Sequence, residues 1–372
     1  MRTPNASFFF SLIFVYFGLF ISSHTEAAQS YKINYNSSTI IKEHSVCKVV
    51  TNSSTTGLAI FVPTNSSGEW SSFYNSPSSG VTAASCKALD LLSVSSAAAF
   101  SLRKLRVLYT GAAIRVRNNN NNAEADISFD SSDAVSATST ATIKVVGSSG
   151  WALNSTMNFS SFYSGATVYV TIFYDQSGNN KNLAQASTAN QPRIVNGGSL
   201  DLNPSSKIGI HWFDTTSRSL EGSAPMIGGS EFTVNLIKYE RTRTTVTDFM
   251  LSADGDSGGR ILGHVPWSDG NIYFDSGTCC NYPQRISGAS GVAANTTNIY
   301  TFTNSTSANQ KYIYVNTNSI ASGAGAVATV NRNVLGSANN GMYHEYIIFS
   351  SVLSATDRST LLANQKTFWS TP

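Results

Sequence analysis

The chain has 372 residues, a net charge of +3 and 12% charged side chains, about half the share of an average soluble protein. Hydrophobic residues make up 41% and aromatic residues 11%, which excludes global disorder. The near balance of 24 basic and 21 acidic residues argues against a nucleic-acid partner. The polar residues are mostly Ser, Thr, Asn and Gly, a composition that favours many short strands joined by polar turns.

Residues 1–27 predict a secretory signal peptide. An apolar run over residues 8–21 follows Arg2, and small residues lead to an expected cleavage after Ala27. The run is too short for a comfortable membrane span, and no other stretch approaches about 20 apolar residues. We therefore expect a secreted, extracellular protein with no membrane span in the mature chain.

Seven N-x-S/T triplets agree with secretion, because such triplets accept glycans on surface loops of secreted eukaryotic proteins. The predicted glycosylation sites are Asn36, Asn52, Asn65, Asn154, Asn158, Asn295 and Asn304.

The four cysteines agree with an oxidising compartment and allow three pairings. We expect Cys47–Cys86, which would close a loop of about 40 residues and contribute roughly 4 kcal/mol on the chain-entropy model. The second expected pair is Cys279–Cys280. Adjacent α-carbons lie about 3.8 Å apart, so this bond requires a strained, tight turn. The alternative is that Cys279 and Cys280 are free or separately paired.

Residues 28–86 predict a small Ser/Thr/Asn-rich N-terminal subdomain, with a strand at 59–63 and a short helix at 69–73. A helix is expected over 96–109, because Ala97, Phe100, Leu105 and Leu108 follow helical spacing. The basic residues between them are interpreted as its solvated face; they are Arg103, Lys104 and Arg106.

From residue 113 the pattern changes to strands separated by clusters of Gly, Asn, Ser and Asp. The predicted strands are 113–117, 141–146, 166–174, 207–213, 232–239, 271–274, 299–303, 312–315, 326–330 and 343–349. A closing helix over 355–368 follows Ser354, which is suited to be its N-cap. Residues 87–372 are therefore expected to form an antiparallel β-sandwich.

Two stretches resemble the catalytic domain of the fungal-type α-L-arabinofuranosidase B family. They are residues 98–129, with AAFSLRKLRVLYTGAAIRVR and AEADISF, and residues 168–185, with TIFYDQSGNNKNLAQ. Further on, PWSDGNIYFDSG at 266–277 and GMYHEYIIFSSVLS at 341–354 resemble laminin-G-like proteins. The resemblance implies an all-β, concanavalin A-like jelly roll with one or two short helices. Within its most specific element, YDQSGN at 174–179, the polar residues are interpreted as turn formers.

The catalytic residues of that family have no counterpart at the matching positions. Where the family has a nucleophilic Glu in an Asp-x-Glu-Asn-Asn segment, this chain has Gly277 after Asp275. Where its acid/base Asp follows two glycines, this chain has no carboxylate in residues 335–339. The family also has a neighbouring cysteine pair in its sugar pocket, before the nucleophile strand rather than after it. The sulfur pair Cys279–Cys280 is thus an analogous feature at a different place.

Glycoside hydrolysis by the usual route needs two carboxyl groups, about 5–5.5 Å apart in retaining enzymes. The weak catalytic candidates are Asp269, Asp275 and Glu345. Asp269 precedes a glycine and is interpreted mainly as a turn former. Asp275 is either a turn former or a sugar ligand, and Glu345 is interpreted as a buried or surface group rather than a catalyst.

Sugar binding needs less: a flat ring for the apolar face of the sugar and a few polar groups for its hydroxyls. These residue types occur together around the predicted strand 271–274. The candidate carbohydrate-binding residues are Trp267, Tyr273, Asp275, Cys279, Cys280, Asn281, Tyr282 and Arg285, with His264 as a further polar group. The alternative interpretation is ordinary core and turn packing.

No resident cofactor is expected. The His and Cys spacing does not match a zinc site, and no Gly-rich phosphate loop occurs. Asp254-Gly255-Asp256 leaves a loop-bound Ca²⁺ open, although Val265 stands where an EF-hand has its last Glu.

Three functions are compatible with these features. The leading one is a secreted, non-catalytic carbohydrate-binding or adhesive protein on an arabinofuranosidase-like scaffold, with glycans as partners. The second is an active α-L-arabinofuranosidase-type hydrolase of arabinose-containing polysaccharide. The third is a structural matrix or coat protein.

Overall fold

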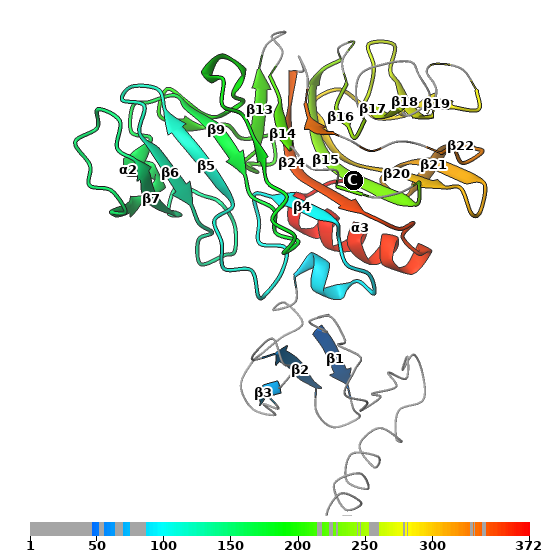
Figure 1. Cartoon of the computed structure of the whole chain (residues 1–372), viewed down its shortest axis with the longest axis horizontal. Coiled ribbons are helices and arrows are strands. Elements are labelled where there is room, and N and C mark those ends of the chain that lie inside the picture. Colours follow the sequence, from blue (N-terminus) through cyan, green and yellow to red (C-terminus); the bar gives the residue numbers. More distant parts are fainter. Residues whose placement is uncertain are drawn as a thin grey trace, which may run out of the picture. The chain divides into compact units, whose positions relative to one another are not determined.

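The computed structural model describes two compact units, Met1–Ala84 and Ser85–Pro372, within which some segments are not described (Figure 1). The described residues are 47–51, 56–63, 70–74, 87–213, 218–222, 226–227, 230–243, 245, 247–252, 260–277, 280, 282–327, 330, 332–336 and 340–372. The predicted signal peptide lies outside these ranges and stays a prediction, as do the predicted domain boundaries.

The N-terminal unit contains a three-stranded antiparallel sheet. Its strands are β1 (Cys47–Thr51), β2 (Thr56–Pro63) and β3 (Trp70–Tyr74), in that order. The strand expected at 59–63 is confirmed by β2. The helix expected at 69–73 is wrong, because this segment pairs with β2 as β3. Trp, Phe and Tyr favour strands, and pairing with a neighbouring strand decides between the two structures.

The C-terminal unit is an antiparallel β-sandwich, as the resemblance implies. Its first sheet follows the order β8-β7-β6-β5-β9-β11-β13-β24-β15-β20-β21-β22. These strands are β5 (Ile114–Asn118), β6 (Glu124–Ile127), β7 (Thr140–Val145), β8 (Thr156–Asn158), β9 (Val168–Phe173), β11 (Arg193–Asn196), β13 (Ile210–Phe213), β15 (Phe232–Thr242), β20 (Thr296–Ser305), β21 (Gln310–Val315), β22 (Asn318–Gly323) and β24 (Asn340–Phe349). Two further strands join it, β4 (Ala98–Ser101) beside β24 and β12 (Ser199–Leu200) beside β11.

The second sheet continues from the end of β9 in the order β10-β14-β23-β16-β17-β18-β19. Its strands are β10 (Leu183–Ala184), β14 (Leu220–Gly222), β16 (Phe249–Met250), β17 (Arg260–His264), β18 (Asn271–Gly277), β19 (Arg285–Ala289) and β23 (Asn333–Leu335). The helical elements are α2 (Phe159–Phe162), α3 (Ala355–Trp369) and two 3-10 turns, Ala88–Leu91 and Thr188–Asn190.

Alternation along the strands places one face of each sheet in a shared core. Phe249 of the second sheet packs edge to face on Phe302 and at a tilt on Tyr346 of the first, with ring centroids 5.0 and 6.4 Å apart. Gly263 pairs with Phe249 across β16 and β17, and any side chain at Gly263 would collide with that ring. The outer faces of the two sheets therefore lie on opposite sides of the sandwich.

Most predicted strands after residue 113 are confirmed, with ends shifted by a few residues, and the helix after Ser354 is confirmed as α3. The Ser354 hydroxyl accepts a hydrogen bond from the Asp357 amide at 3.0 Å, as an N-cap does. The strand predicted at 326–330 is wrong, because its described residues are in no strand.

The helix predicted at 96–109 is also wrong. Residues 98–101 form β4, which pairs with β24, and residues 102–109 are irregular. Arg103, expected on a solvated face, is 5% exposed. The helical spacing of the apolar residues is overridden by tertiary contacts, because β24 offers an unpaired edge with which residues 98–101 pair. Of the apolar residues after them, Leu105 packs in the loop.

The YDQSGN element supplies the polar groups that hold β4 in place. Asp175 accepts hydrogen bonds from the backbone amides of Ala99 and Lys181 and from the Ser177 hydroxyl. The Gln176 side chain accepts from the Leu105 amide at 2.8 Å and donates to two backbone carbonyls on the same segment. The interpretation of this motif as a structural turn is confirmed.

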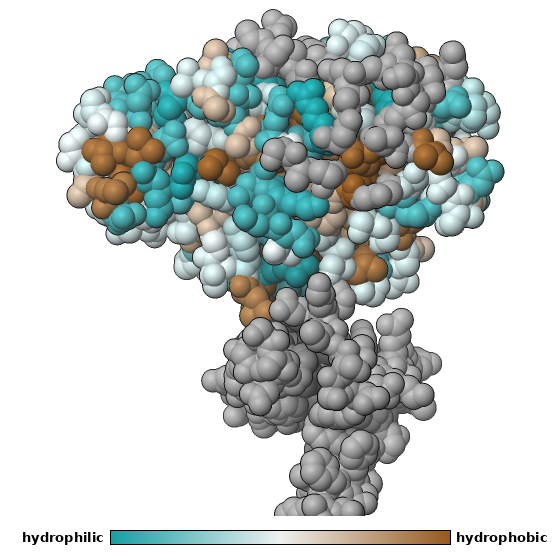
Figure 2. Space-filling view, viewed as in Figure 1, coloured by the Kyte–Doolittle hydropathy of each residue, from teal (hydrophilic) through white to brown (hydrophobic). Residues whose placement is uncertain are grey.

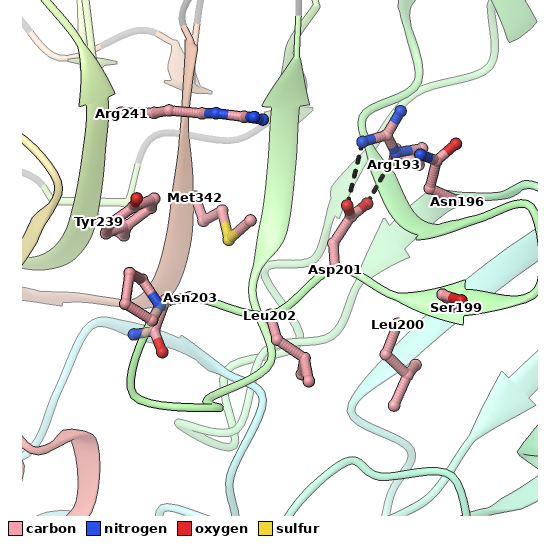
Figure 3. Close-up of a pocket in the computed structure, with 11 residues that line it drawn as sticks. Arg193, Asn196, Ser199, Leu200, Asp201, Leu202, Asn203, Tyr239, Arg241 and Met342 are labelled. Carbon is pink, nitrogen blue, oxygen red and sulfur yellow. Dashed lines mark hydrogen bonds and ion pairs between the residues drawn. The ribbon is translucent and has the colours of Figure 1, made fainter.

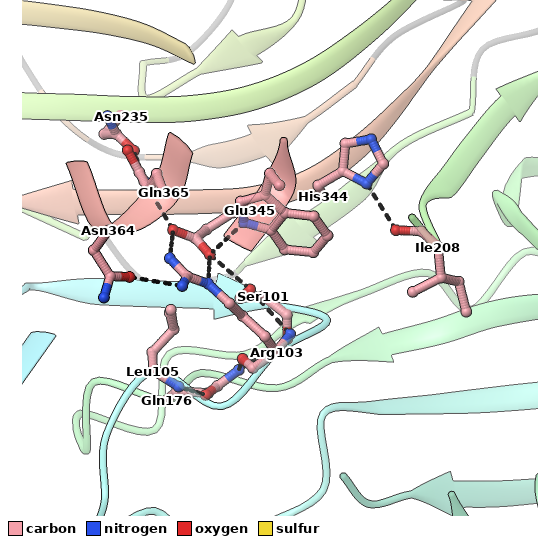
Figure 4. A network of polar contacts seen from close by, with 11 residues as sticks. Ser101, Arg103, Leu105, Gln176, Ile208, Asn235, His344, Glu345, Asn364 and Gln365 are labelled. Atoms are coloured by element: carbon pink, nitrogen blue, oxygen red, sulfur yellow. Dashed lines mark hydrogen bonds and ion pairs between the residues drawn. The ribbon is translucent and has the colours of Figure 1, made fainter. Parts of the chain in front are cut away.

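Glu345, in the middle of β24, is fully buried beneath α3 (Figure 4). Arg103 donates to both carboxylate oxygens, at 2.8 and 3.2 Å. Three further side chains donate to it: Ser101, Gln365 and Trp369. Burial raises the pKa of Glu345, but the Arg103 charge and these hydrogen bonds outweigh it, so its pKa is lowered and the carboxylate is ionised.

The surface drawn in Figure 2 has only small, separate hydrophobic areas between hydrophilic residues. Large exposed hydrophobic side chains are scattered along the described chain: Leu108, Val145, Leu153, Leu202, Tyr282, Val327 and Val352. On this face, the described residues thus form no broad apolar area of the kind that packs against another protein. Within the described residues, none of the helices has the length and apolar character to cross a membrane.

We expect Glu345→Gln to lower the free energy of unfolding by about 3–5 kcal/mol, because it leaves the buried Arg103 guanidinium without its counter-charge. The measurement is urea denaturation. Glu221→Gln is the matched control, since Glu221 pairs with Arg332 at 2.9 Å where both side chains are about two-fifths exposed. That control should cost less than about 1 kcal/mol. Equal losses in the two variants would contradict this account of Glu345.

Candidate functional site

The hairpin β17–β18 and the following strand β19 present the predicted sugar-binding residues. In β18 the side chains of Ile272 and Phe274 are buried in the core, so Tyr273 and Asp275 face outward. Strand pairing sets His264 beside Tyr273 and Arg285 beside Asp275. We call these residues, with Trp267, the Trp267 cluster; its members are His264, Trp267, Tyr273, Asp275 and Arg285.

A tight turn places Trp267 over this face. The Gly270 amide donates to the Trp267 carbonyl at 2.9 Å, and the Trp267 amide donates to the Asn271 carbonyl at 2.7 Å. Gly270 has a φ of 86°, which glycine adopts without strain. The hydrogen bond from the Tyr273 hydroxyl, at 2.6 Å, and that from the Asn271 amide lower the pKa of the exposed Asp269 carboxyl. Asp269 therefore acts as a turn former and orients Tyr273.

Three rings of the cluster meet edge to face. The His264 and Trp267 centroids are 4.4 Å apart at 72°, and those of Trp267 and Tyr273 are 6.1 Å apart at 77°. Trp267 and Tyr273 are both half-buried, so each ring keeps part of its surface in solvent. The Arg285 guanidinium lies 5.0 Å from the centre of the Tyr273 ring. The cluster thus combines apolar ring surface with a fixed cation.

Asp275 is completely buried and held by two arginines. Arg285 donates to its two oxygens at 2.5 and 2.7 Å, and the Arg260 Nε lies 3.2 Å from Oδ2. The hydrogen bond to Asp275 raises the pKa of the Arg285 guanidinium despite its partial burial. This bidentate geometry fixes the plane of the Arg285 side chain. Asp275 is therefore a positioning residue for Arg285.

Lys311 of β21 lies fully buried under β18. Its Nζ donates to the Ser276 hydroxyl at 3.1 Å and to the Gln284 carbonyl at 2.7 Å. Burial lowers the pKa of Lys311 to about 8, and the Asp275 charge opposes that shift in part. Lys311 thereby secures the segment that leads into Arg285.

The remaining predicted sugar-binding residues are only partly described. Tyr282 is 74% exposed and Cys280 is exposed, whereas Cys279 and Asn281 lie outside the described residues. Cys280 is disulfide-bonded. The side chains of the other three cysteines are not described, so both predicted pairings stay predictions.

The three carboxyl candidates for catalysis are not assembled into a pair. Asp269 is exposed in a turn, Asp275 is bound by two arginines, and Glu345 is enclosed under α3 on the other sheet. Gly277, at the position of the family's nucleophile, has a φ of 98° that a glutamate would adopt only with strain. The positive φ of Gly277 differs from the negative φ of a residue in an extended strand.

The structure also tests the predicted glycosylation sites that it describes. Asn154, Asn158 and Asn295 are exposed. Asn304 is fully buried, and its side-chain nitrogen donates to the carbonyls of Ser230 and Ala326. The prediction for Asn304 is wrong, because its amide is inaccessible in the folded protein. Asn36, Asn52 and Asn65 lie outside the described residues.

Sequence reasoning missed two features. Arg260 belongs to the site, but its position next to Asp275 follows only from the pairing of β17 with β18, which the sequence does not show. A separate pocket of about 600 Å³ opens on the outer face of the first sheet (Figure 3). The segment 193–204 supplies most of its lining, and Tyr239, Arg241 and Met342 complete it from β15 and β24, which are distant in sequence.

No group of three or more His, Cys, Asp or Glu side chains that could hold a metal ion occurs among the described residues. Residues 254–256, where the sequence is compatible with a bound Ca²⁺, lie outside them.

The fold can be compared with known proteins. No protein-family model matches the chain, and no curated protein matches it. A solved structure of an arabinofuranosidase complexed with arabinofuranosyl-α-1,2-xylobiose matches with a TM-score of 0.52 at 14% identity. The chain has an arabinofuranosidase-like fold.

The match covers 72% of this chain and 62% of the arabinofuranosidase chain, so this chain spans less than two thirds of that protein's length. A mutant GH54 α-L-arabinofuranosidase soaked with 4-nitrophenyl α-L-arabinofuranoside matches over the same shares, at 15% identity and a TM-score of 0.48. At identities of 14% and 15% the comparison establishes the fold of this chain and no activity.

The lowered pKa of Lys311, which holds the segment before Arg285, can be tested through the pH dependence of stability. Its pKa is near 8 in the folded protein against an ordinary value of 10.5. Between these pH values the unfolded chain binds more protons at this residue, so the wild-type stability should rise with pH there relative to Lys311→Met. The measurement is the difference in unfolding free energy between the two proteins from pH 7 to 10.5. A constant or falling difference would contradict the lowered pKa.

Proposed function

We propose that this protein is a secreted carbohydrate-binding protein, without hydrolytic activity, that binds glycans at the Trp267 cluster. The observation that carries the proposal is the combination on one outer sheet face of partly exposed rings with a rigidly held arginine. The rings suit the apolar face of a sugar, and the guanidinium suits its hydroxyl oxygens. The arabinofuranosidase-like fold makes arabinose-containing polysaccharide the first substrate class to examine, by analogy of fold.

The state of the carboxyl groups supports a non-catalytic role. A general acid must keep its proton near neutral pH and reach the leaving oxygen. The pKa of Asp269 is lowered, and both oxygens of the buried Asp275 are occupied by arginine. Of these two described acidic residues at the cluster, Asp269 therefore lacks the raised pKa and Asp275 lacks the free oxygen that a general acid of a glycosidase needs.

Secretion is part of the proposal and rests on the sequence. The predicted signal peptide and the exposed Asn154, Asn158 and Asn295 triplets support it, as does the disulfide at Cys280.

We expect the full secreted protein to bind arabinoxylan oligosaccharides in isothermal titration calorimetry, and Trp267→Ala to weaken binding about tenfold through loss of ring contact. Trp151→Ala is the matched control. Trp151 is also half-buried and packs on Phe162, with ring centroids 5.3 Å apart, on another part of the sandwich. Trp267→Phe should recover part of the affinity. Unchanged affinity in Trp267→Ala, or no binding by the wild-type protein, would contradict the proposal.

The hydrolase alternative is tested with an aryl α-L-arabinofuranoside. We expect no release of the chromophore by the wild-type protein. Release that is lost in Asp275→Asn would overturn the non-catalytic proposal and place Asp275 in an active site, whereas release retained in that variant would point to other carboxyl groups.

A further inference from the structure

The pocket of about 600 Å³ lies on the outer face of the first sheet, on the side of the sandwich opposite to the Trp267 cluster. Three of its lining residues, Arg193, Met342 and Tyr239, belong to one cross-strand row on β11, β24 and β15. The buried His211 of β13 stands between Arg193 and Met342 in that row and does not line the pocket. The segment after β12 forms its wall, with Asp201, Leu202, Asn203 and Pro204. Its volume lies within the range of about 300–1,000 Å³ that is typical of small-molecule sites.

Arg193 is fixed at one end of this pocket. It donates to both oxygens of Asp201, at 2.7 and 3.0 Å, and its guanidinium stacks 4.4 Å from the centre of the Phe213 ring. Burial raises the pKa of Asp201, but hydrogen bonds from His211 and Arg193 outweigh it, so its pKa is lowered. The Nη1 atom of Arg193 takes no part in the bonds to Asp201, and Figure 3 shows one guanidinium nitrogen directed away from it.

Arg241 gives the pocket a net positive charge. It is exposed and has neither an ion pair nor a hydrogen bond among the described residues. In Figure 3 its side chain is extended and points in the direction of Arg193. Asp201 is neutralised by Arg193, so the Arg241 charge is uncompensated within the lining. A ligand with a negative charge is therefore favoured.

The rest of the lining suits a sugar. Asn196 and Ser199 offer amide and hydroxyl groups, while Leu202, 45% exposed, and Met342 offer apolar surface. Next to the lining, between Arg193 and Met342 in the strand row, the Nε2 of the buried His211 has no hydrogen-bond partner among the described residues.

We propose that this pocket is a second glycan site, for the carboxylate-bearing sugar of an acidic oligosaccharide, with Arg241 as the residue that binds the carboxylate. Arginine binds carboxylates through paired, charge-assisted hydrogen bonds. The hydroxyls of the sugar would meet Asn196, Ser199 and the Nη1 of Arg193, and its apolar face would meet Leu202. This site is separate from the Trp267 cluster, so neither proposal depends on the other.

The test is calorimetric titration of the full secreted protein with trigalacturonic acid and, separately, with the neutral galactose trisaccharide. We expect the acidic ligand alone to bind, and Arg241→Gln to weaken it at least about tenfold, the effect of losing one charge-assisted hydrogen bond. Lys144→Gln is the matched control: it removes the same charge from β7, which contributes no lining residue. Arg241 makes no hydrogen bond or ion pair with the part of the chain that the structure describes, so its variant should fold.

The Trp267→Ala variant separates this site from the first. It should bind trigalacturonic acid with unchanged affinity, and its loss of affinity would assign the acidic ligand to the Trp267 cluster and overturn the proposal. Equal binding of the neutral trisaccharide, no binding of either ligand, or full affinity in Arg241→Gln would overturn it as well.

Discussion

An ionised carboxylate buried in the central strand β24 constrains much of this fold. Glu345 is inaccessible to water, so its charge has to be compensated by protein groups. The compensating groups come from two separate parts of the chain: Ser101 at the end of β4 with Arg103 just after it, and Gln365 and Trp369 on α3. The two ends of the sandwich unit are thereby attached to the same strand. Since Arg103 is also buried, removing either charge would leave the other charge buried without a counter-charge, which is strongly destabilising.

The segment that carries Arg103 is held a second time by the turn after β9. Asp175 and Gln176 satisfy backbone groups of residues 99–105 that no strand partner could reach. The two stretches that resemble the arabinofuranosidase B family, residues 98–129 and 168–185, thus make structural contacts, and the Trp267 cluster lies elsewhere in the chain. The side chains of Asp175 and Gln176 in the YDQSGN element attach β4 and the segment after it to the first sheet.

The two outer faces of the sandwich are chemically different. On the second sheet, Asp275 is bound by Arg260 and Arg285 beside partly exposed rings. On the first sheet, Arg193 and Asp201 neutralise each other, and Arg241 remains as an extra charge beside a pocket. In both places a bidentate ion pair fixes an arginine, which is a rigid way to present donors to a ligand. A single scaffold can thus present a fixed arginine beside aromatic rings on one side and a fixed arginine beside a pocket on the other.

The sequence by itself determined the all-β class, most of the strands after residue 113, the capped helix after Ser354 and the gathering of Trp267, Tyr273 and Arg285. These features depend on local alternation, turn chemistry or short separation along the chain. Tertiary structure alone decided that residues 98–101 form a strand and that Arg103 and Asn304 are buried. It also decided that Asp275 is bound by two arginines and that Arg241 and Arg193 line the same pocket. Apart from Asp275, whose arginines come from the adjacent strands β17 and β19, these outcomes depend on the packing of segments that are distant in sequence. Residue spacing within one segment does not specify such packing.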